Sequence, residues 1–185
     1  MRRAILPFSF EPCLIPGLFE IQPKVFSDSR GYFFEAWSQR DFEAAGILAN
    51  FVQDNQSRSV KGVLRGLHFQ KTHAQDKLVR AIEGEVYDVA VDIRPGSPGY
   101  GKWHAVVLSS EKQNQFYIPA GFAHGFLVLS GTAVFAYKCT DFYYPEDEGG
   151  IIWNDPAIDI KWPDLGMDYL LSEKDKKLPG YVNGL

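Results

Sequence analysis

The chain has few cysteines and no long apolar run, which argues against a disulfide-rich protein and against a protein with a membrane-spanning helix. Its two cysteines, Cys13 and Cys139, are too few for a disulfide framework, and their spacing matches neither a CxxC redox pair nor a zinc site. No segment approaches the roughly 18 apolar residues that a membrane span requires. Prolines and Glu11 also interrupt the short apolar run after Arg3. We therefore expect a cytoplasmic protein with reduced thiols and no membrane partner.

Basic residues are scarce and dispersed. The chain has 19 Lys and Arg against 23 Asp and Glu, a formal net charge of -4, and no run of five basic residues. This balance argues against a nucleic acid or an anionic membrane as the main partner. Gly-rich phosphate loops of the GxGxxG or Walker type are absent too. Any anionic ligand is therefore expected to be bound by a few individual Lys or Arg side chains and not by a basic surface.

Short strands between turn signals are what the sequence has in abundance, and aromatic residues make up 15% of it. The clearest strand is 85–93, in which Tyr87, Val89 and Val91 alternate with Asp88, and the Pro- and Gly-rich turn at 94–99 ends it. This pattern predicts an all-β sandwich or barrel. Further strands are expected at 103–108, 115–118, 124–129 and 132–140.

Helical signal is weak and the length favours one domain. Ser38 to Asp41 resembles a capping box, which predicts one short helix ending near Gly46. A chain of 185 residues with 45% hydrophobic content is long enough for one core. We expect a single domain over 1–185, with a core at about 15–163 and a tail, 164–185, packing on it. Residues 1–11 look like an extension.

Residues 119–124, Pro-Ala-Gly-Phe-Ala-His, fit the PxGxxH half of the cupin pattern, in which a turn places a His at the start of a barrel strand. Metal-binding cupins also need a paired HxH and a following Glu. Residues 68–70 read His-Phe-Gln instead, and His73 and His104 are badly placed to supply the missing ligand. The sequence therefore predicts a barrel without a metal site.

His68 can act as a general base, because the unperturbed imidazole pKa of about 6.5 suits proton transfer near neutral pH. A structural His bonded inside the core is the alternative on the residues alone. Strict alternation puts His68 on the face opposite Arg65. Both can reach one pocket only if Gly66 introduces a bulge or a bend.

Tyr137 is predicted to point inward, because it shares a strand face with Phe135 and Cys139. A buried Tyr is usually a core residue, but a phenol inside a barrel can also donate a proton, and spacing does not choose between the two. Arg65 and Lys77 lie close to His68 in sequence and are candidate cations. An Arg suits bidentate contact with phosphate oxygens, and a Lys suits a developing enolate.

Several blocks occur together in an order that resembles the dTDP-4-dehydrorhamnose 3,5-epimerases of rhamnose biosynthesis. The similarity is collinear from about Val25 to Asp175. It is carried by residues 28–35 (DSRGYFFE), 51–55 (FVQDN), 62–70 (GVLRGLHFQ), 118–126 (IPAGFAHGF), 153–155 (WND) and 171–175 (LSEKD).

The resemblance implies a cupin-type jelly roll that works as a homodimer, in which part of each site comes from the partner subunit and no cofactor takes part. It implies that His68 is the general base, that Asp175 orients and charges it, and that Tyr137 is the general acid. It further implies that Lys77 stabilises the enolate oxygen and that His124 lies in the sugar pocket. Positions that hold the nucleotide and diphosphate are Arg30, Glu35, Gln53, Asp54, Asn55, Arg65, Glu148 and Lys174.

The implied substrate is dTDP-4-dehydro-6-deoxy-D-glucose, whose C4 ketone acidifies the hydrogens on C3 and C5. The implied product is dTDP-4-dehydro-L-rhamnose. A relative that inverts one carbon, or a keto-isomerase, is the alternative among enzymes, and the sequence leaves open whether both carbons are inverted. A cupin that only binds a sugar nucleotide is the alternative outside enzymes. An acid and base pair disfavours that reading, because binding alone needs neither.

Overall fold

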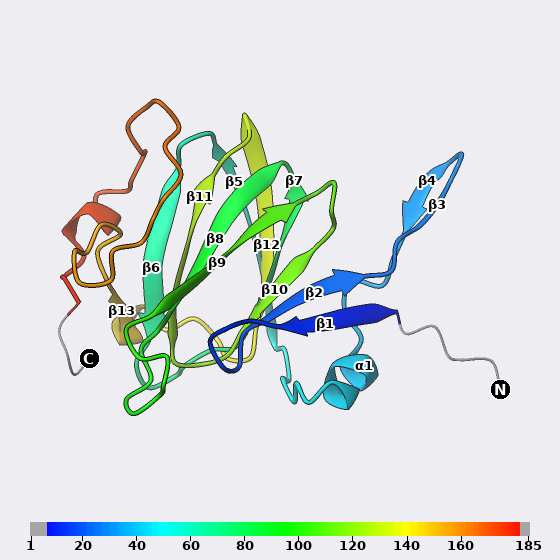
Figure 1. Cartoon of the computed structure of the whole chain (residues 1–185), viewed down its shortest axis with the longest axis horizontal. Helices are drawn as coiled ribbons and strands as arrows, with labels where there is room; N and C mark the ends of the chain where they lie inside the picture. The colour runs from blue at the N-terminus through cyan, green and yellow to red at the C-terminus, as the bar shows by residue number, and fades with distance from the viewer. Residues whose placement is uncertain (1–6, 182–185) are drawn as a thin grey trace.

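Two antiparallel β-sheets face each other and enclose the largest cluster of buried apolar side chains among the described residues (Figure 1). The computed structural model describes residues 7–181. The six-stranded sheet contains, in spatial order, β1 (Phe8–Pro12), β2 (Phe19–Pro23), β10 (Gln115–Ile118), β7 (Lys77–Glu83), β12 (Thr132–Cys139) and β5 (Gln53–Val60). The five-stranded sheet contains β13 (Glu148–Gly150), β6 (Leu64–Gln70), β11 (Phe122–Val128), β8 (Glu85–Asp92) and β9 (Trp103–Ser109). A separate hairpin of β3 (Phe26–Asp28) and β4 (Gly31–Phe33) projects away from both sheets.

The predicted fold class, an all-β jelly-roll barrel with short peripheral helices, is confirmed. The strands expected in the second half of the chain all form, with ends that differ from the prediction by no more than two residues. The expected helix is α1 (Gln39–Ala44), and Gly46 follows it with a φ of +87°, where a glycine avoids steric strain. The Ser38 hydroxyl donates to the Asp41 carboxylate and accepts no hydrogen bond from a backbone N–H of the helix. Within residues 7–181, no helix is long and apolar enough to cross a membrane.

The two chain ends, residues 1–6 and 182–185, lie outside the described residues, although the expected domain of residues 1–185 includes them. Part of the expected N-terminal extension is ordered differently from the prediction. Residues 8–11 belong to β1, which pairs along its whole length with β2. The N-terminal strand thus forms the outer edge of the six-stranded sheet.

Side chains from both sheets meet in one core. Val79 and Phe135 of the six-stranded sheet pack with Ala90 and Phe126 of the five-stranded sheet, and all four are almost fully buried. The rings of Phe126 and Phe135 stack with centroids 4.2 Å apart, so one aromatic pair joins the two sheets directly. Alternation along each strand then decides which polar residues also point inward.

The outer face of the five-stranded sheet is covered by the chain that follows β13. Val89 and Val91 point outward there and pack with Ile151, Ile158 and Ile160. This packing carries the C-terminal segment across the sheet, where the short 3₁₀ turn η2 (Asp175–Lys177) contacts β6. A residue far along the sequence is thereby brought next to the middle of a barrel strand.

Gly66 introduces the irregularity that His68 and Arg65 need in order to share a face. His124 of β11 lies opposite His68, but Phe126 lies opposite Arg65, so two steps on β11 match three on β6. Gly66 has a φ of +114°, which strongly disfavours any residue with a Cβ. A Cβ there would also lie 2.7 Å from the carbonyl oxygen of His124. The bulge turns Arg65 and His68 to the inner side together.

Candidate active site

A cavity of about 280 Å³ opens between the two sheets. Its walls come from β5, β6, β7, β12 and β13, from the loop between β6 and β7, and from the segment between β12 and β13. Most of its polar side chains stand on the inner face of a strand, because they alternate with residues that face outward. The lining residues are Gln53, Asn55, His68, Phe69, Gln70, Gln75, Lys77, Tyr137, Cys139, Tyr143 and Glu148.

His68 is bonded to Asp175 across 107 residues of sequence. An ionised carboxylate can only accept, so Nε2–H of His68 donates to Asp175 Oδ1, at 2.6 Å. The Ser172 hydroxyl donates to the other oxygen of Asp175 at 2.8 Å. Burial raises the pKa of Asp175, but the hydrogen bonds from His68 and Ser172 outweigh it and hold the pKa below its ordinary value. Asp175 is therefore ionised near neutral pH.

The second ring nitrogen of His68 is left free by this bond. In the neutral ring with a proton on Nε2, Nδ1 carries a lone pair. It lies 4.0 Å from Glu148 Oε1, on the side of the cavity that Glu148 lines. Lys174 forms an ion pair with Glu148 Oε2, and the Tyr143 hydroxyl donates to the same oxygen at 2.7 Å. Nδ1 of His68 thus lies on the cavity side of the ring, which has a carboxylate on each side.

The facing wall carries Tyr137 and Lys77, on neighbouring strands of the six-stranded sheet. Lys77 is opposite Cys139 in the β7–β12 pairing, and Tyr137 stands two residues before Cys139 on the same face. Burial lowers the pKa of the Lys77 ammonium. Burial also raises the pKa of the Tyr137 phenol, although the positive charge of Arg65 opposes the rise. The predicted inward orientation of Tyr137 is therefore correct.

His124 forms a second buried pair with a carboxylate. It stands opposite His68 on β11, and its Nε2 lies 2.9 Å from Asp88 Oδ2. Asp88 is fully buried, and burial raises its pKa while the contact with His124 opposes the rise. His124 also faces the ring of Phe135 with centroids 6.2 Å apart. This pair lies on the inner face of the five-stranded sheet, next to the strand that carries His68.

Arg65, Gln53 and Asn55 also lie on the inner side. Arg65 Nη2 donates to Ser59 Oγ at 3.1 Å, which links β6 to β5 across the gap between the two sheets. Gln53 donates its amide to Asn55 Oδ1 at 3.0 Å. These contacts place one guanidinium and two amides within the same inner region as Tyr137 and His68.

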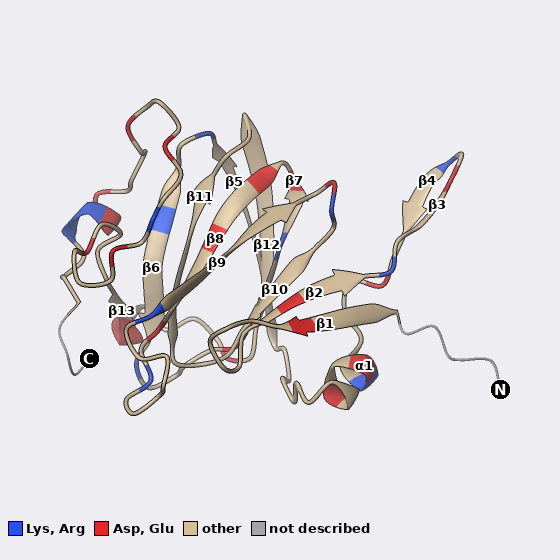
Figure 2. Cartoon of the chain, in the orientation of Figure 1, with Lys and Arg blue, Asp and Glu red and all other residues tan. Residues whose placement is uncertain are grey.

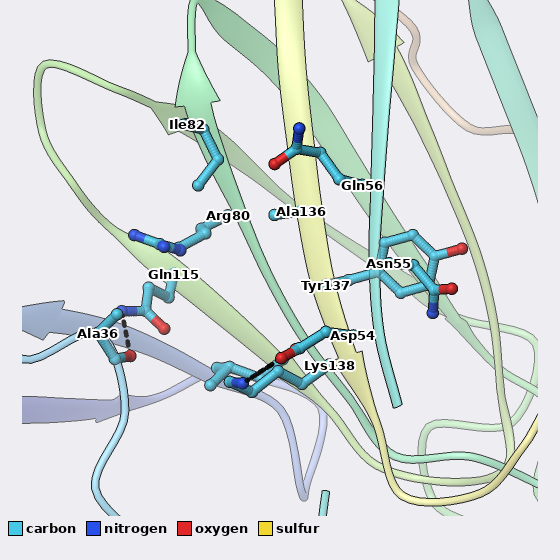
Figure 3. A pocket seen from close by; sticks show the side chains of 11 residues that line it. Ala36, Asp54, Asn55, Gln56, Arg80, Ile82, Gln115, Ala136, Tyr137 and Lys138 are labelled. Carbon is cyan, nitrogen blue, oxygen red and sulfur yellow. Dashed lines mark hydrogen bonds and ion pairs between the residues drawn. The ribbon is translucent and has the colours of Figure 1, made fainter. Parts of the chain in front are cut away.

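Six of the predicted site residues do not line this cavity: Arg30, Glu35, Asp54, Arg65, His124 and Lys174. Asp54 alternates with Asn55 and points to the outer face of the six-stranded sheet, where it pairs with Lys138 at 2.9 Å. Figure 3 shows Tyr137 and Asn55 on one side of the sheet, and Lys138 and Arg80 on the other. Arg30 belongs to the projecting hairpin, where it is largely exposed and paired with Asp28, and Glu35 follows that hairpin at an exposed position.

Charge is concentrated in the turn that supplies Asp175. Residues 173–177 are five consecutive charged residues, and Figure 2 shows this mixed segment beside the barrel. Lys174 points to Glu148, and Lys176 pairs with Glu173. Among residues 7–181, no three His, Cys, Asp or Glu side chains are grouped so that they could hold a metal ion.

Several lining residues were not predicted from the sequence, above all Tyr143. Its ring lies in an aromatic run, 142–144, that follows β12, and its backbone N–H donates to Gln53 Oε1 at 3.2 Å. This cluster of aromatic residues soon after a predicted barrel strand is the sequence feature that could have identified Tyr143. Gln75 was missed for a different reason, because it lies in a loop without a recognisable pattern.

Comparison with known proteins places the chain in a family. The family model described as dTDP-4-dehydrorhamnose 3,5-epimerase matches residues 12–182. The dTDP-4-dehydrorhamnose 3,5-epimerase of Pseudomonas aeruginosa is 58% identical over 164 residues, which is 88% of this chain and 90% of that protein. The enzyme of the same name from Escherichia coli is 55% identical and covers 85% of this chain and 86% of its own length.

Solved structures agree with these relatives. The crystal structure of the 3,5-epimerase from Legionella pneumophila in complex with dTDP-4-keto-L-rhamnose superposes with a TM-score of 0.88. It is 50% identical and covers 95% of this chain and 99% of that one. The dTDP-4-dehydrorhamnose 3,5-epimerase from Elizabethkingia anophelis gives a TM-score of 0.90 at 48% identity, with 95% and 97% covered. This chain belongs to the dTDP-4-dehydrorhamnose 3,5-epimerase family.

Proposed function

We propose that this protein is an isomerase that inverts C3 and C5 of dTDP-4-dehydro-6-deoxy-D-glucose and forms dTDP-4-dehydro-L-rhamnose. One observation carries the mechanism. His68 stands on one sheet, Tyr137 and Lys77 stand on the facing sheet, and all three line one cavity. Inversion requires a proton to leave one face of the sugar ring and another to arrive on the opposite face. Groups on two facing walls meet that requirement.

His68 is the general base in this proposal. Its Nδ1 removes the proton next to the C4 ketone, and the imidazolium that forms is stabilised by the bond from Nε2 to Asp175, 2.6 Å long. The electrons move into an enolate whose oxygen carries the negative charge. The buried ammonium of Lys77 stabilises that charge, an effect that is strong because burial weakens solvent screening.

Tyr137 completes the inversion in this proposal. Its phenol stays protonated because burial raises its pKa, so it can donate to the enolate carbon from the side opposite His68. Solvent restores the phenol and removes the proton from His68 before the next step. The same pair then acts on the second carbon, and the reaction requires no metal or cofactor. A sample stripped by a chelator is expected to keep its rate.

We also propose a homodimer in which the hairpin of one subunit completes the site of the other. Arg30 and Glu35 match nucleotide-binding positions of the family, but they lie on or beside the projecting hairpin and not at the cavity that His68 lines (Figure 1). Phe26 and Phe33 of that hairpin are 53% and 67% exposed, which is unusual for large apolar side chains and typical of an interface. A second copy of the chain would cover them.

We also propose that the protein is cytoplasmic. Both Cys13 and Cys139 are free thiols, as in proteins of reducing compartments. Cell fractionation with an antibody to the protein would test this location.

NMR of the sugar during incubation with dTDP-4-dehydro-6-deoxy-D-glucose in heavy water tests the proposed reaction. We expect deuterium at both C3 and C5 and the appearance of the L-rhamno product. Deuterium and inversion at one carbon alone would identify a single-carbon epimerase. Tight binding without any exchange would identify a binding protein and contradict the proposal.

A further inference from the structure

Gln70 is the last residue of β6, two residues after His68. Its side chain forms hydrogen bonds to the backbone of two loops. It is 7% exposed. The amide oxygen accepts from the backbone N–H of Tyr144 at 2.7 Å. The amide nitrogen donates to the carbonyl of His73 at 2.7 Å and to that of Phe142 at 3.0 Å. Both amide hydrogens are therefore used on the backbone, one in the loop after β6 and one in the segment after β12.

The bonds to Phe142 and Tyr144 flank Tyr143 on both sides. Tyr143 lines the cavity, and its hydroxyl donates to Glu148, which also lines the cavity. A single buried amide thus holds the backbone immediately before and immediately after an aromatic wall residue. Because few side chains can both donate twice and accept, neither Glu nor an aliphatic residue can replace these three bonds.

We propose that Gln70 is a positioning residue for nucleotide-sugar binding, and that it acts through Tyr143 and Glu148 without taking part in proton transfer. This inference rests on the proposed function for the identity of the ligand. Its physical basis is preorganisation: a wall that is already fixed loses less conformational freedom when the ligand binds. Without the Gln70 amide, the segment 142–144 has to be ordered by the ligand itself.

The test uses Gln70→Met, which keeps the length of the side chain and removes all three hydrogen bonds. We expect the Kd for dTDP, measured by calorimetry, to rise about tenfold, while kcat stays within about twofold of the parent value. The Kd of Gln70→Glu should lie between that of the parent and that of Gln70→Met. The Glu side chain still accepts from Tyr144, but its carboxylate cannot donate to either carbonyl. Circular dichroism verifies that each variant is folded.

Asn114→Leu is the matched control. The Asn114 amide is also buried, accepts from the backbone N–H of Ser109 at 3.1 Å, and donates to Val107 O at 3.0 Å and to Glu20 at 2.8 Å. It does not line the cavity. A general loss of stability should therefore lower the melting temperature of both variants, and only the Gln70 variant should bind dTDP more weakly.

A double-mutant cycle with Tyr143→Ala tests the route of the effect. If Gln70 acts through Tyr143, Gln70→Met should change the Kd little once Tyr143 is absent. Additive losses would overturn the inference, as would an unchanged Kd in the single variant or a loss confined to kcat. If the parent protein itself fails to bind dTDP, the proposed function is wrong, which is a separate outcome from a failure of the Gln70 inference.

Discussion

In the proposed mechanism, Tyr137 returns the proton to the sugar and His68 removes it, so a change at Tyr137 should separate the two steps. Tyr137→Phe leaves the His68 base and the Lys77 charge in place, so in heavy water it should still exchange hydrogen for deuterium at C3 or C5. Protonated His68 trades with solvent and returns a deuteron to the same face. Inverted product should fall by about 10²-fold or more. The measurement is NMR of exchange and inversion in one sample, and inversion at the parent rate would require another donor.

Asp175 and His68 are expected to act as one unit. Asp175→Asn replaces the carboxylate that holds Nε2–H with an amide that cannot stabilise the imidazolium, so it should cost nearly as much kcat as His68→Asn. The double variant should be little worse than either single one. Additive losses in the steady-state rates would assign Asp175 a different role.

The pH profile should report Lys77 at its alkaline end. Burial lowers the pKa of the Lys77 ammonium and raises that of the Tyr137 phenol, so Lys77 is expected to lose its proton at a lower pH than an ordinary lysine. Loss of the Lys77 charge removes the stabilisation of the enolate, and kcat/KM should fall there. In Lys77→Arg the overall rate is lower, but that alkaline limb should disappear because a guanidinium stays charged. A limb that persists in the Arg variant would point to Tyr137.

At the scale of the element, the bulge in β6 decides whether Arg65 and His68 share a face. Gly66→Ala adds a Cβ 2.6 Å from Gly125 Cα at a φ of +114°, so it should lower the free energy of unfolding by about 3 kcal/mol or more. Gly131→Ala is the control, because a Cβ there meets no atom within 4 Å. Chemical denaturation measures both. Equal stabilities would show that β6 tolerates a regular register.

The elements that the sequence predicted well carry an alternating row of buried apolar residues on at least one face. β8 was found through Tyr87, Val89 and Val91, which face outward and are covered by the chain after β13, and β12 was found through Ala133 and Phe135, which face inward. β5 was not predicted, because its inward positions carry Asn55, Ser57 and Ser59, which point to the cavity and to Arg65 and not to the core. The contact between His68 and Asp175 spans 107 residues, so periodicity could not find it, and the family resemblance did.

At the scale of the whole molecule, the proposed dimer can be tested by complementation. Subunits with Arg30→Ala and subunits with His68→Asn are co-expressed with different tags. If Arg30 serves the partner's cavity, half of the dimers are mixed and each has one intact site, which gives about a quarter of the parent activity. Light scattering should give twice the mass of the chain for every variant.

The control pair for this experiment is Lys77→Met with His68→Asn. Both residues line the cavity of one subunit, so no mixed dimer contains an intact site and activity should stay absent. Recovery in the control pair would show that residues other than those of the hairpin are shared. No recovery with Arg30→Ala, in a sample that scatters as a dimer, would show that the hairpin serves its own subunit.

The stacked rings of Phe126 and Phe135 act as a spacer between the two halves of the catalytic machinery. His68 belongs to one sheet and Tyr137 to the other, so in the proposed mechanism the reach of the acid depends on how closely the two sheets pack beside the cavity. A smaller side chain at Phe126 lets the sheets approach and changes the reach of Tyr137 without altering any group that touches the sugar. In the proposed mechanism, the ratio of exchange to inversion at C3 and at C5 is therefore expected to change with the apolar residues that separate the two sheets.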